Sequence, residues 1–200
     1  DLPESFTVTF LANGETVAVV IGRKGDRSVK APELPQLAGY TAAWPAFTPT
    51  GRDMTITAVY RQNLVSGGRV TKSGIYFVPW LASGEITIAG GLDVTLIGLD
   101  SGTDRFDNLT LTVGSGTKLT LQDVRITGDR TLLSLAGKNT LTLLGRNELI
   151  GCADASGNAC PTVVSGGDLT INGTGSLQLQ ALANNAAFLG AEKSKISIED

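Results

Sequence analysis

The chain of 200 residues contains no histidine and only two cysteines. Without histidine it cannot build a Ser-His-Asp triad, and it lacks the side chain that binds metals most often in proteins. No stretch approaches 18 consecutive apolar residues, so we expect no membrane insertion. The formal net charge is −3 and the basic residues form no cluster, which argues against nucleic acid or an anionic membrane as a partner.

Charge and composition divide the chain into two parts. Residues 1–62 carry six basic and six acidic side chains, whereas residues 63–200 carry ten and thirteen. The second part is also much richer in triplets such as Leu-Thr-Leu. We therefore expect an all-β or mostly β chain made of two units, 1–62 and 63–200.

The first part begins with a predicted β-hairpin. Two apolar runs flank Asn13-Gly14, and this dipeptide is the strongest short signal for a two-residue hairpin turn. Phe6, Val8 and Phe10 alternate with threonine, so one face of the first strand should be buried and the other exposed to solvent.

The remainder of the first part predicts one more strand and a crossing segment. Residues 31–40, APELPQLAGY, carry two prolines, which exclude a central strand. Residues 53–60, DMTITAVY, alternate again between apolar and polar positions. We expect Tyr40 and Trp44 to fill the core of this small domain.

The order of these features resembles the B repeat, or Listeria-Bacteroides repeat, of Gram-positive surface proteins such as internalins. It runs from TVTF through Asn-Gly, a second strand and a Pro-x-x-Pro segment to Gly39-Tyr40, Trp44 and MTITAVY. The resemblance covers nearly all of residues 5–60 and departs from the common pattern after Trp44. It implies a β-grasp-like module used outside the cell as a spacer or adhesion unit, without catalytic residues.

The second part contains two series of strand patterns that recur at a similar period. One series of strands starts at Val94, Leu119, Leu141, Leu169 and Ile196. A second series starts at Ile86, Leu109, Leu132, Val163 and Phe188. Short Gly-bearing turns separate the paired members, which is typical of a single-stranded, right-handed parallel β-helix. A β-sandwich is the alternative, because closely spaced hairpins also fit the number of strands.

The same part resembles the right-handed β-helical domains of secreted bacterial carbohydrate-binding proteins. The residues that carry the resemblance are GEITIAGG (84–91), LDVTLIG (92–98) and GDLTINGTGSLQLQA (167–181). It implies an extracellular, cell-wall or surface location and contact with glycans. Since the last repeat stops in mid-coil and a solenoid end needs a cap, we expect the intact protein to continue past Asp200.

Catalytic chemistry finds little support in the sequence. A polysaccharide lyase of the β-helix class would need acidic residues together with Arg125 or Arg130 as base. The acids are scattered over turns, where such side chains commonly bond the backbone. These acids are Asp93, Asp100, Asp104, Asp107, Asp123 and Asp168. We expect no catalytic residues and no cofactor.

Two weaker ligand sites are also predicted. Calcium prefers six to eight oxygen ligands, and the acidic turn 100–108 offers Asp100, Asp104 and Asp107. Tyr76 and Trp80 could stack on a sugar ring, although the simpler interpretation is that they cap the first coil.

The two cysteines bound the stretch CADASGNAC. Zinc needs four ligands and thioredoxin-type chemistry needs Cys-x-x-Cys, so neither fits Cys152 and Cys160. A disulfide remains, as is usual in exported chains. In the second series, the interval from Leu132 to Val163 is longer by eight than each of the two intervals before it. We therefore predict an inserted finger of about the length of this stretch, closed at its base by Cys152–Cys160.

Three functions remain open from the sequence. The first is a non-catalytic, adhesin-like surface or secreted protein whose β-helix presents a face to a polysaccharide, a host glycan or a protein. The second is a polysaccharide lyase, and the third is a structural stalk without a ligand. The absence of histidine and of an acid cluster weighs against the enzyme.

Overall fold

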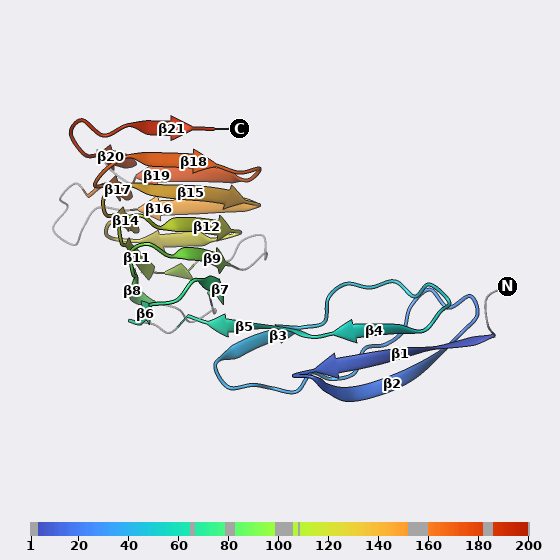
Figure 1. Cartoon of the computed structure of the whole chain (residues 1–200). Coiled ribbons are helices and arrows are strands. Elements are labelled where there is room, and N and C mark those ends of the chain that lie inside the picture. Colours follow the sequence, from blue (N-terminus) through green and yellow to red (C-terminus); the bar gives the residue numbers. More distant parts are fainter. Residues whose placement is uncertain are drawn as a thin grey trace. The chain divides into compact units, whose positions relative to one another are not determined.

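The computed structural model describes residues 4–64, 67–78, 83–98, 106–107, 109–151, 160–181 and 186–199 (Figure 1). Over these residues the chain consists of β-strands and turns, with no helix. A search of them accordingly finds no helical segment suited to crossing a bilayer. The chain forms two compact units, 1–62 and 63–200, and this boundary coincides with the change in composition.

The first unit is organised around a β-hairpin. Strand β1 (Ser5–Ala12) pairs antiparallel with β2 (Glu15–Arg23) through a two-residue turn at Asn13 and Gly14. Both turn residues have positive φ angles, 52° and 81°, and this type I′ geometry matches the right-handed twist of the strands. The predicted hairpin is confirmed.

Two further pairings complete the first unit. On its other edge β1 pairs parallel with β4 (Met54–Thr57), which gives the strand order β2-β1-β4. Strand β3 (Tyr40–Ala43), which the sequence did not predict, pairs antiparallel with β5 (Val59–Asn63). Both prolines of the segment lie outside strands, as expected, and β3 begins only at its last residue, Tyr40.

The core of the first unit lies on one face of β1. Phe6, Val8 and Phe10 are buried, and the ring of Trp44 packs edge-on against Phe10 with the ring centroids 5.1 Å apart. The indole Nε1–H of Trp44 donates to the Pro32 carbonyl oxygen at 2.8 Å. The prediction for Trp44 is therefore confirmed.

The prediction that Tyr40 fills this core is wrong. Its side chain is 40% exposed at the start of β3. The second aromatic position against Phe10 is taken by Phe47 instead, with the ring centroids 5.6 Å apart. Trp44 and Phe47 already pack against Phe10, which leaves Tyr40 outside the aromatic cluster.

Three parallel sheets make up the second unit, and in Figure 1 their strands are stacked in successive layers. Sheet I contains, in chain order, β7 (Gly74–Phe77), β9 (Asp93–Ile97), β12 (Lys118–Gln122), β15 (Asn139–Leu144), β18 (Leu169–Asn172) and β21 (Ile196–Ile198). Sheet II contains β6 (Arg69–Val70), β8 (Gly84–Ile88), β11 (Leu109–Val113), β14 (Leu133–Leu135), β17 (Val163–Ser165) and β20 (Phe188–Gly190). Sheet III contains β10 (Phe106–Asp107), β13 (Arg125–Gly128), β16 (Arg146–Gly151) and β19 (Ser176–Ala181).

From β8 onward the chain visits sheets II, I and III in turn, and we call one such pass a coil. The inner strands of each sheet pair in parallel with the equivalent strands of the coil before and the coil after. This pairing differs from the antiparallel sheets of the β-sandwich that the sequence leaves as an alternative.

The register corrects the predicted series by two positions at Leu111 and Ile171, and by one position at Leu133, which takes the place predicted for Leu132. Ile86 pairs with Leu111 rather than Leu109, and Leu141 pairs with Ile171 rather than Leu169. A two-residue shift keeps every side chain on the same face, because side chains alternate along a strand. The apolar pattern is therefore unable to distinguish the two registers, whereas the hydrogen-bonded ladder does.

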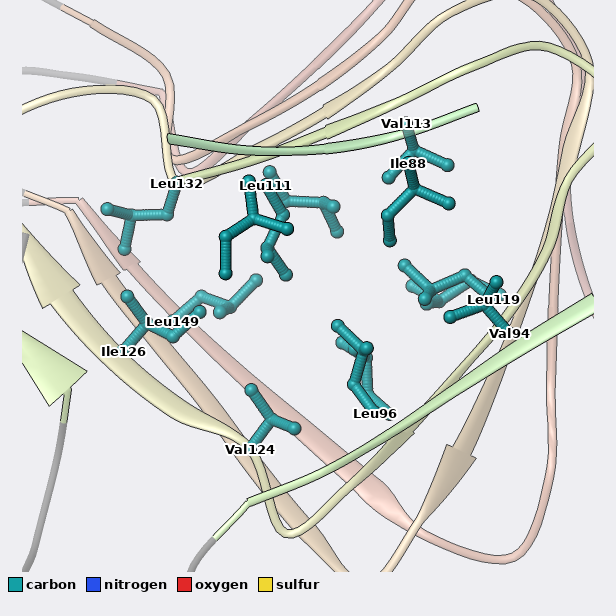
Figure 2. Packing of buried hydrophobic residues seen from close by; sticks show 14 of the residues in the cluster. Ile88, Val94, Leu96, Leu111, Val113, Leu119, Val124, Ile126, Leu132 and Leu149 are labelled. Atoms are coloured by element: carbon teal, nitrogen blue, oxygen red, sulfur yellow. The ribbon is translucent and has the colours of Figure 1, made fainter. Parts of the chain in front are cut away.

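Apolar side chains from the three sheets fill the interior of the coils. Figure 2 shows Leu96 of β9, Leu111 of β11 and Val124, which directly precedes β13, pointing toward one another. Inward residues that pair between neighbouring coils, such as Val94 and Leu119, are also fully buried. Threonines between them face outward and are partly exposed, so the predicted alternation within the Leu-Thr-Leu strands is confirmed.

Two buried asparagines satisfy the backbone at the corners between strands. The Asn147 side chain, which is 0% exposed, accepts from Val124 N–H at 3.0 Å and donates to Leu144 O at 3.0 Å. Asn139 does the same one corner earlier, accepting from Thr117 N–H and donating to Ala136 O. Each amide thus links two successive coils with no main-chain polar group left open at that point.

Replacing Asn147 with alanine should destabilise the second unit by about 3 kcal/mol, because it leaves buried main-chain groups without partners. Urea unfolding of the full chain would measure this change. Asn172→Ala is the matched control, since its amide oxygen accepts a single hydrogen bond from the partly buried Thr142 hydroxyl. A loss below about 1 kcal/mol is expected there, and equal losses in both variants would contradict the corner role of Asn147.

The first unit should lose stability in acid through Asp53. The main-chain N–H of Thr7 donates to the Asp53 carboxylate at 2.7 Å, and this bond, with the Thr7 hydroxyl, holds the pKa of Asp53 below its ordinary value. A lowered folded-state pKa stabilises the fold above the ordinary carboxyl pKa of about 4 and ceases to do so as the pH falls through the folded value. The difference in melting temperature between wild type and Asp53→Asn should be constant at neutral pH and shrink in acid. A difference that grows in acid would refute the assignment.

Candidate functional site

A depression of about 510 Å³ lies on the outward face of sheet II. It crosses β8, β11, β14 and β17, so residues from four successive coils contribute to it. Its lining is rich in hydroxyl groups and contains one acidic and one basic side chain. The residues that line it are Glu85, Thr110, Leu111, Thr112, Arg130, Thr131, Ser134, Cys160 and Val164. We call this depression the sheet II groove.

The floor of the groove is set by the pairing of the strands. Thr112 lies beside Ser134, and Ser134 lies beside Val164, in one row across the sheet. Neighbouring strands are about 4.8 Å apart, so the row offers side chains at a regular interval. At one end the Thr112 hydroxyl donates to the Glu85 carboxylate at 2.8 Å, which fixes both groups toward the groove.

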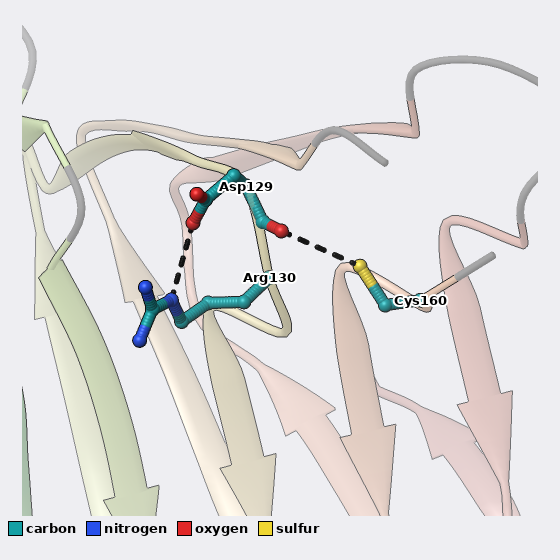
Figure 3. Close-up of polar contacts among 3 residues, drawn as sticks. All are labelled: Asp129, Arg130 and Cys160. Atoms are coloured by element: carbon teal, nitrogen blue, oxygen red, sulfur yellow. Dashed lines mark hydrogen bonds and ion pairs between the residues drawn. The ribbon is translucent and has the colours of Figure 1, made fainter. Parts of the chain in front are cut away.

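The wall of the groove is formed by the turn after β13. Figure 3 shows Asp129, Arg130 and Cys160 at this corner. The Nε–H of Arg130 donates to the Asp129 carboxylate at 3.1 Å, and the Cys160 sulfur lies 3.9 Å from the Asp129 carbonyl oxygen. The Arg130 side chain is 64% exposed, so this ion pair contributes at most about 1 kcal/mol and leaves the guanidinium open to a ligand.

A second charged cluster lies on the outward face of sheet III. Arg125 pairs in register with Glu148, and Arg146 forms an ion pair with Glu148. Arg125 is only 4% exposed, and its Nε and Nη1 atoms are buried without a hydrogen-bond partner. Of the two arginines that the sequence offers to a lyase, only Arg130 therefore lines the groove, while Arg125 lies on a different sheet.

Tyr76 packs its ring within the second unit. The side chain is 9% exposed and belongs to the apolar interior of the second unit. Its hydroxyl donates to the Lys72 carbonyl oxygen at 2.8 Å. This burial agrees with the simpler interpretation of Tyr76 as a packing residue, and Trp80 lies outside the described residues, so ligand contact at these two residues stays a prediction.

The predicted calcium ligands fall outside the described side chains. Asp100 and Asp104 are not among the described residues, and Asp107 is described only as a strand residue of β10 paired with Thr127. Among the side chains that the structure describes, no three His, Cys, Asp or Glu residues converge on one point. Calcium at residues 100–108 stays a prediction.

Other acids hold turns together, as the sequence indicates for acids in turns. The Asp123 carboxylate accepts from Arg146 N–H at 2.9 Å, and the Asp168 carboxylate accepts from Lys195 N–H at 2.9 Å. Each bond links a turn to the following coil. These carboxylates therefore have a structural use that needs no ligand.

The strand register places the extra length of the CADASGNAC stretch between β16 and β17. In sheet II, Leu111 pairs with Leu133 and Leu133 with Val163, and the second step along the chain is longer than the first by eight. In sheet I the spacing along the chain also grows by eight residues, from the pair Leu119 and Leu141 to the pair Leu141 and Ile171. The eight additional residues in this interval therefore remain after the predicted strand positions are corrected. Cys152 lies outside the described residues, so the disulfide itself stays a prediction.

The groove was not predicted from the sequence, apart from naming Arg130 as a candidate base. Thr110, Thr112 and Ser134 are ordinary outward residues of strands, and nothing in their local pattern marks a site. Only the stacking of coils brings Glu85 beside Thr110, which belongs to the following coil. Aligning the repeats and comparing the outward polar residues at equivalent positions could have indicated the groove.

No family model, curated protein or solved structure matches this chain significantly. The resemblances to the B repeat and to carbohydrate-binding β-helices therefore stay predictions.

Intact-mass analysis of the oxidised chain should show a mass two hydrogens below that of the dithiol, as expected for a Cys152–Cys160 bond. Closing a loop of about nine residues stabilises the fold by roughly 2.5 kcal/mol on the chain-entropy model. Cys152→Ser and Cys160→Ser should each lower stability by a similar amount, and reduction should add nothing further to either variant. Two alkylatable thiols in the native, non-reduced protein would exclude the bond.

Proposed function

We propose that this chain is a non-catalytic module of a bacterial cell-surface or secreted protein, and that it binds an extended polysaccharide in the sheet II groove. In this proposal residues 1–62 are a B-repeat-like, β-grasp-like spacer. Residues 63–200 are a right-handed parallel β-helix, and the protein acts outside the cell.

The strand arrangement supports the β-helix. The chain passes through sheets II, I and III in a fixed cycle, and all strand pairs between coils are parallel in the part that the structure describes. The parallel pairing of β1 with the later strand β4, beside the antiparallel β1–β2 hairpin, is compatible with a β-grasp-like module.

The sheet II groove is the observation that carries the binding proposal. It spans four strands and offers hydroxyl groups from Thr110, Thr112 and Ser134 between Glu85 and Arg130. Hydroxyl and charged side chains of this kind bond the hydroxyl groups of sugars, and a guanidinium pairs with a carboxylate or a sulfate. A linear, acidic polysaccharide lying across the strands is therefore the ligand that best fits this lining.

A polysaccharide lyase is the second candidate, and Arg130 in the groove is the observation that favours it. As a base, Arg130 would have to give up a proton, although a guanidinium keeps its proton under ordinary conditions. In the groove its Nε–H already donates a hydrogen bond to the Asp129 carboxylate, which is a donor's role and not that of a base. Binding without cleavage is consequently the better supported function.

A glycan array probed with the full chain, with and without calcium, should show binding to acidic, extended polysaccharides. Arg130→Ala should weaken binding about tenfold or more, because it removes a charge-assisted contact. Arg52→Ala, which removes an exposed arginine in the first unit, is the matched control and should leave binding unchanged.

A uronate-release assay on the same polysaccharides completes the test. Unsaturated products would replace the binding proposal with the lyase. If the array gave no signal, the structural stalk without a ligand would be the remaining function. Binding that needs calcium, and is lost in Asp104→Asn but kept in Arg130→Ala, would move the site from the groove to residues 100–108.

A further inference from the structure

Strand β2 is an open edge of the sheet in the first unit. In the order β2-β1-β4 it pairs with β1 on one side, and the described part of the chain places no strand on its other side. The stretch from Thr16 to Gly22, TVAVVIG, contains neither a charged residue nor a proline. Such residues are what commonly keep an edge from pairing with another chain, so β2 is protected only by the bulge that shifts its register beside Phe10.

The main-chain groups of Val19 and Ile21 face this open side. Arg23 N–H donates to the Asp26 carboxylate at 2.8 Å, and Arg23 O accepts from Asp26 N–H at 3.0 Å, so the main chain of Arg23 points away from β1. Because the groups of an antiparallel strand alternate between its two sides, those of Ile21 and Val19 point the same way. The turn after β2 thus occupies the groups of Arg23 and leaves those of the two apolar residues open.

The side chains of the same two residues are apolar and exposed. Val19 is 55% exposed and Ile21 is 72% exposed. They lie beside Thr9 and Thr7 of β1, on the face of the sheet opposite to the buried core. An edge with open main-chain groups and apolar side chains is the surface that strand addition uses, since the main chain supplies affinity and alternate side chains supply specificity.

We infer that β2 pairs antiparallel with β2 of a second copy of the chain, about a two-fold axis at Val20. In this register Val19 of each copy lies opposite Ile21 of the other, so the open groups of these residues meet in two reciprocal pairs. A two-fold axis makes the interface isologous, so the assembly closes at a dimer. The inference concerns the first unit alone and is independent of the glycan-binding proposal.

The charges at the two ends of β2 favour a second copy as the partner. Glu15 begins the strand, whereas Arg23 ends it and Lys24 follows. Two antiparallel copies place the acidic end of each strand against the basic end of the other, whereas two parallel copies would place Glu15 beside Glu15.

The bulge brings the charged residues into the same register as the apolar ones. It adds one residue between Glu15 and Val19, so the pairing of Val19 with Ile21 sets Glu15 opposite Lys24 of the second copy. Lys24 is 47% exposed in its ion pair with Glu4, so its ammonium group is accessible to a second carboxylate. One register therefore satisfies the main chain, the apolar side chains and the charges of β2.

Sedimentation equilibrium of the 200-residue chain over a range of concentrations tests the inference. The wild type should be a reversible dimer. Ile21→Lys should weaken dimerisation about a hundredfold or more, because the symmetric interface loses the apolar side chain twice and gains two charges at the edge.

Charge reversal at the strand ends tests the register. Glu15→Lys and Lys24→Glu should each weaken dimerisation about tenfold, because like charges then meet at both ends of the interface. An equimolar mixture of the two variants should dimerise about as tightly as the wild type, since opposite charges meet at both ends of the mixed dimer. A mixture that associates no more tightly than either variant alone would overturn the inferred pairing.

Ile75→Lys is the matched control. Ile75 is 54% exposed on β7 of the second unit, and its replacement should leave the dimer intact. Far-ultraviolet circular dichroism and melting temperature confirm that each variant is folded. A monomeric wild type, growth beyond the dimer, or equal weakening by Ile75→Lys and Ile21→Lys would also overturn the inference.

Discussion

The burial of each inward side chain by the same position in the coils on either side holds the second unit together. A single coil of three short strands encloses too little apolar surface to be stable, whereas stacked coils share one continuous interior. Positions such as Leu119 and Leu141 are buried because each is covered on two sides by the equivalent side chains of the neighbouring coils. The corner asparagines and the groove also depend on this stacking, since Asn147 accepts from Val124 N–H of the preceding coil and Glu85 accepts from the Thr112 hydroxyl of the following coil.

The requirement that each residue stack on the same position of the neighbouring coils is weakest at the corners between strands. Buried amides such as Asn147 close some corners, while the corner between β16 and β17 accepts eight additional residues without a change in the ladder on either side. An insertion there alters neither the inward pattern nor the pairing, because the strands re-enter the stack in register. The length of the chain at this corner can therefore vary while the sheets remain the same, and Cys160 borders the groove wall at Asp129.

Local patterns predicted the elements, and long-range contacts decided what they form. The hairpin at Asn13-Gly14 and the buried face of β1 follow from a two-residue turn and an alternation of two, which act over a few residues. The choice between Tyr40 and Phe47 as the second aromatic depends on where a chain without regular strands returns to Phe10, which no local pattern encodes. The groove was missed for the same reason, because Glu85 and Ser134 become neighbours of Thr112 only through the register of three coils.

The groove crosses four strands that belong to four different coils. In a stack held only by nearest-neighbour contacts, pulling on the chain detaches coils one after another from an end. A polymer seated across β8, β11, β14 and β17 bonds all four coils at once and must be released before any one of them can peel away. If the proposed ligand occupies the groove, the second unit would therefore resist mechanical extension more strongly than the unliganded protein does.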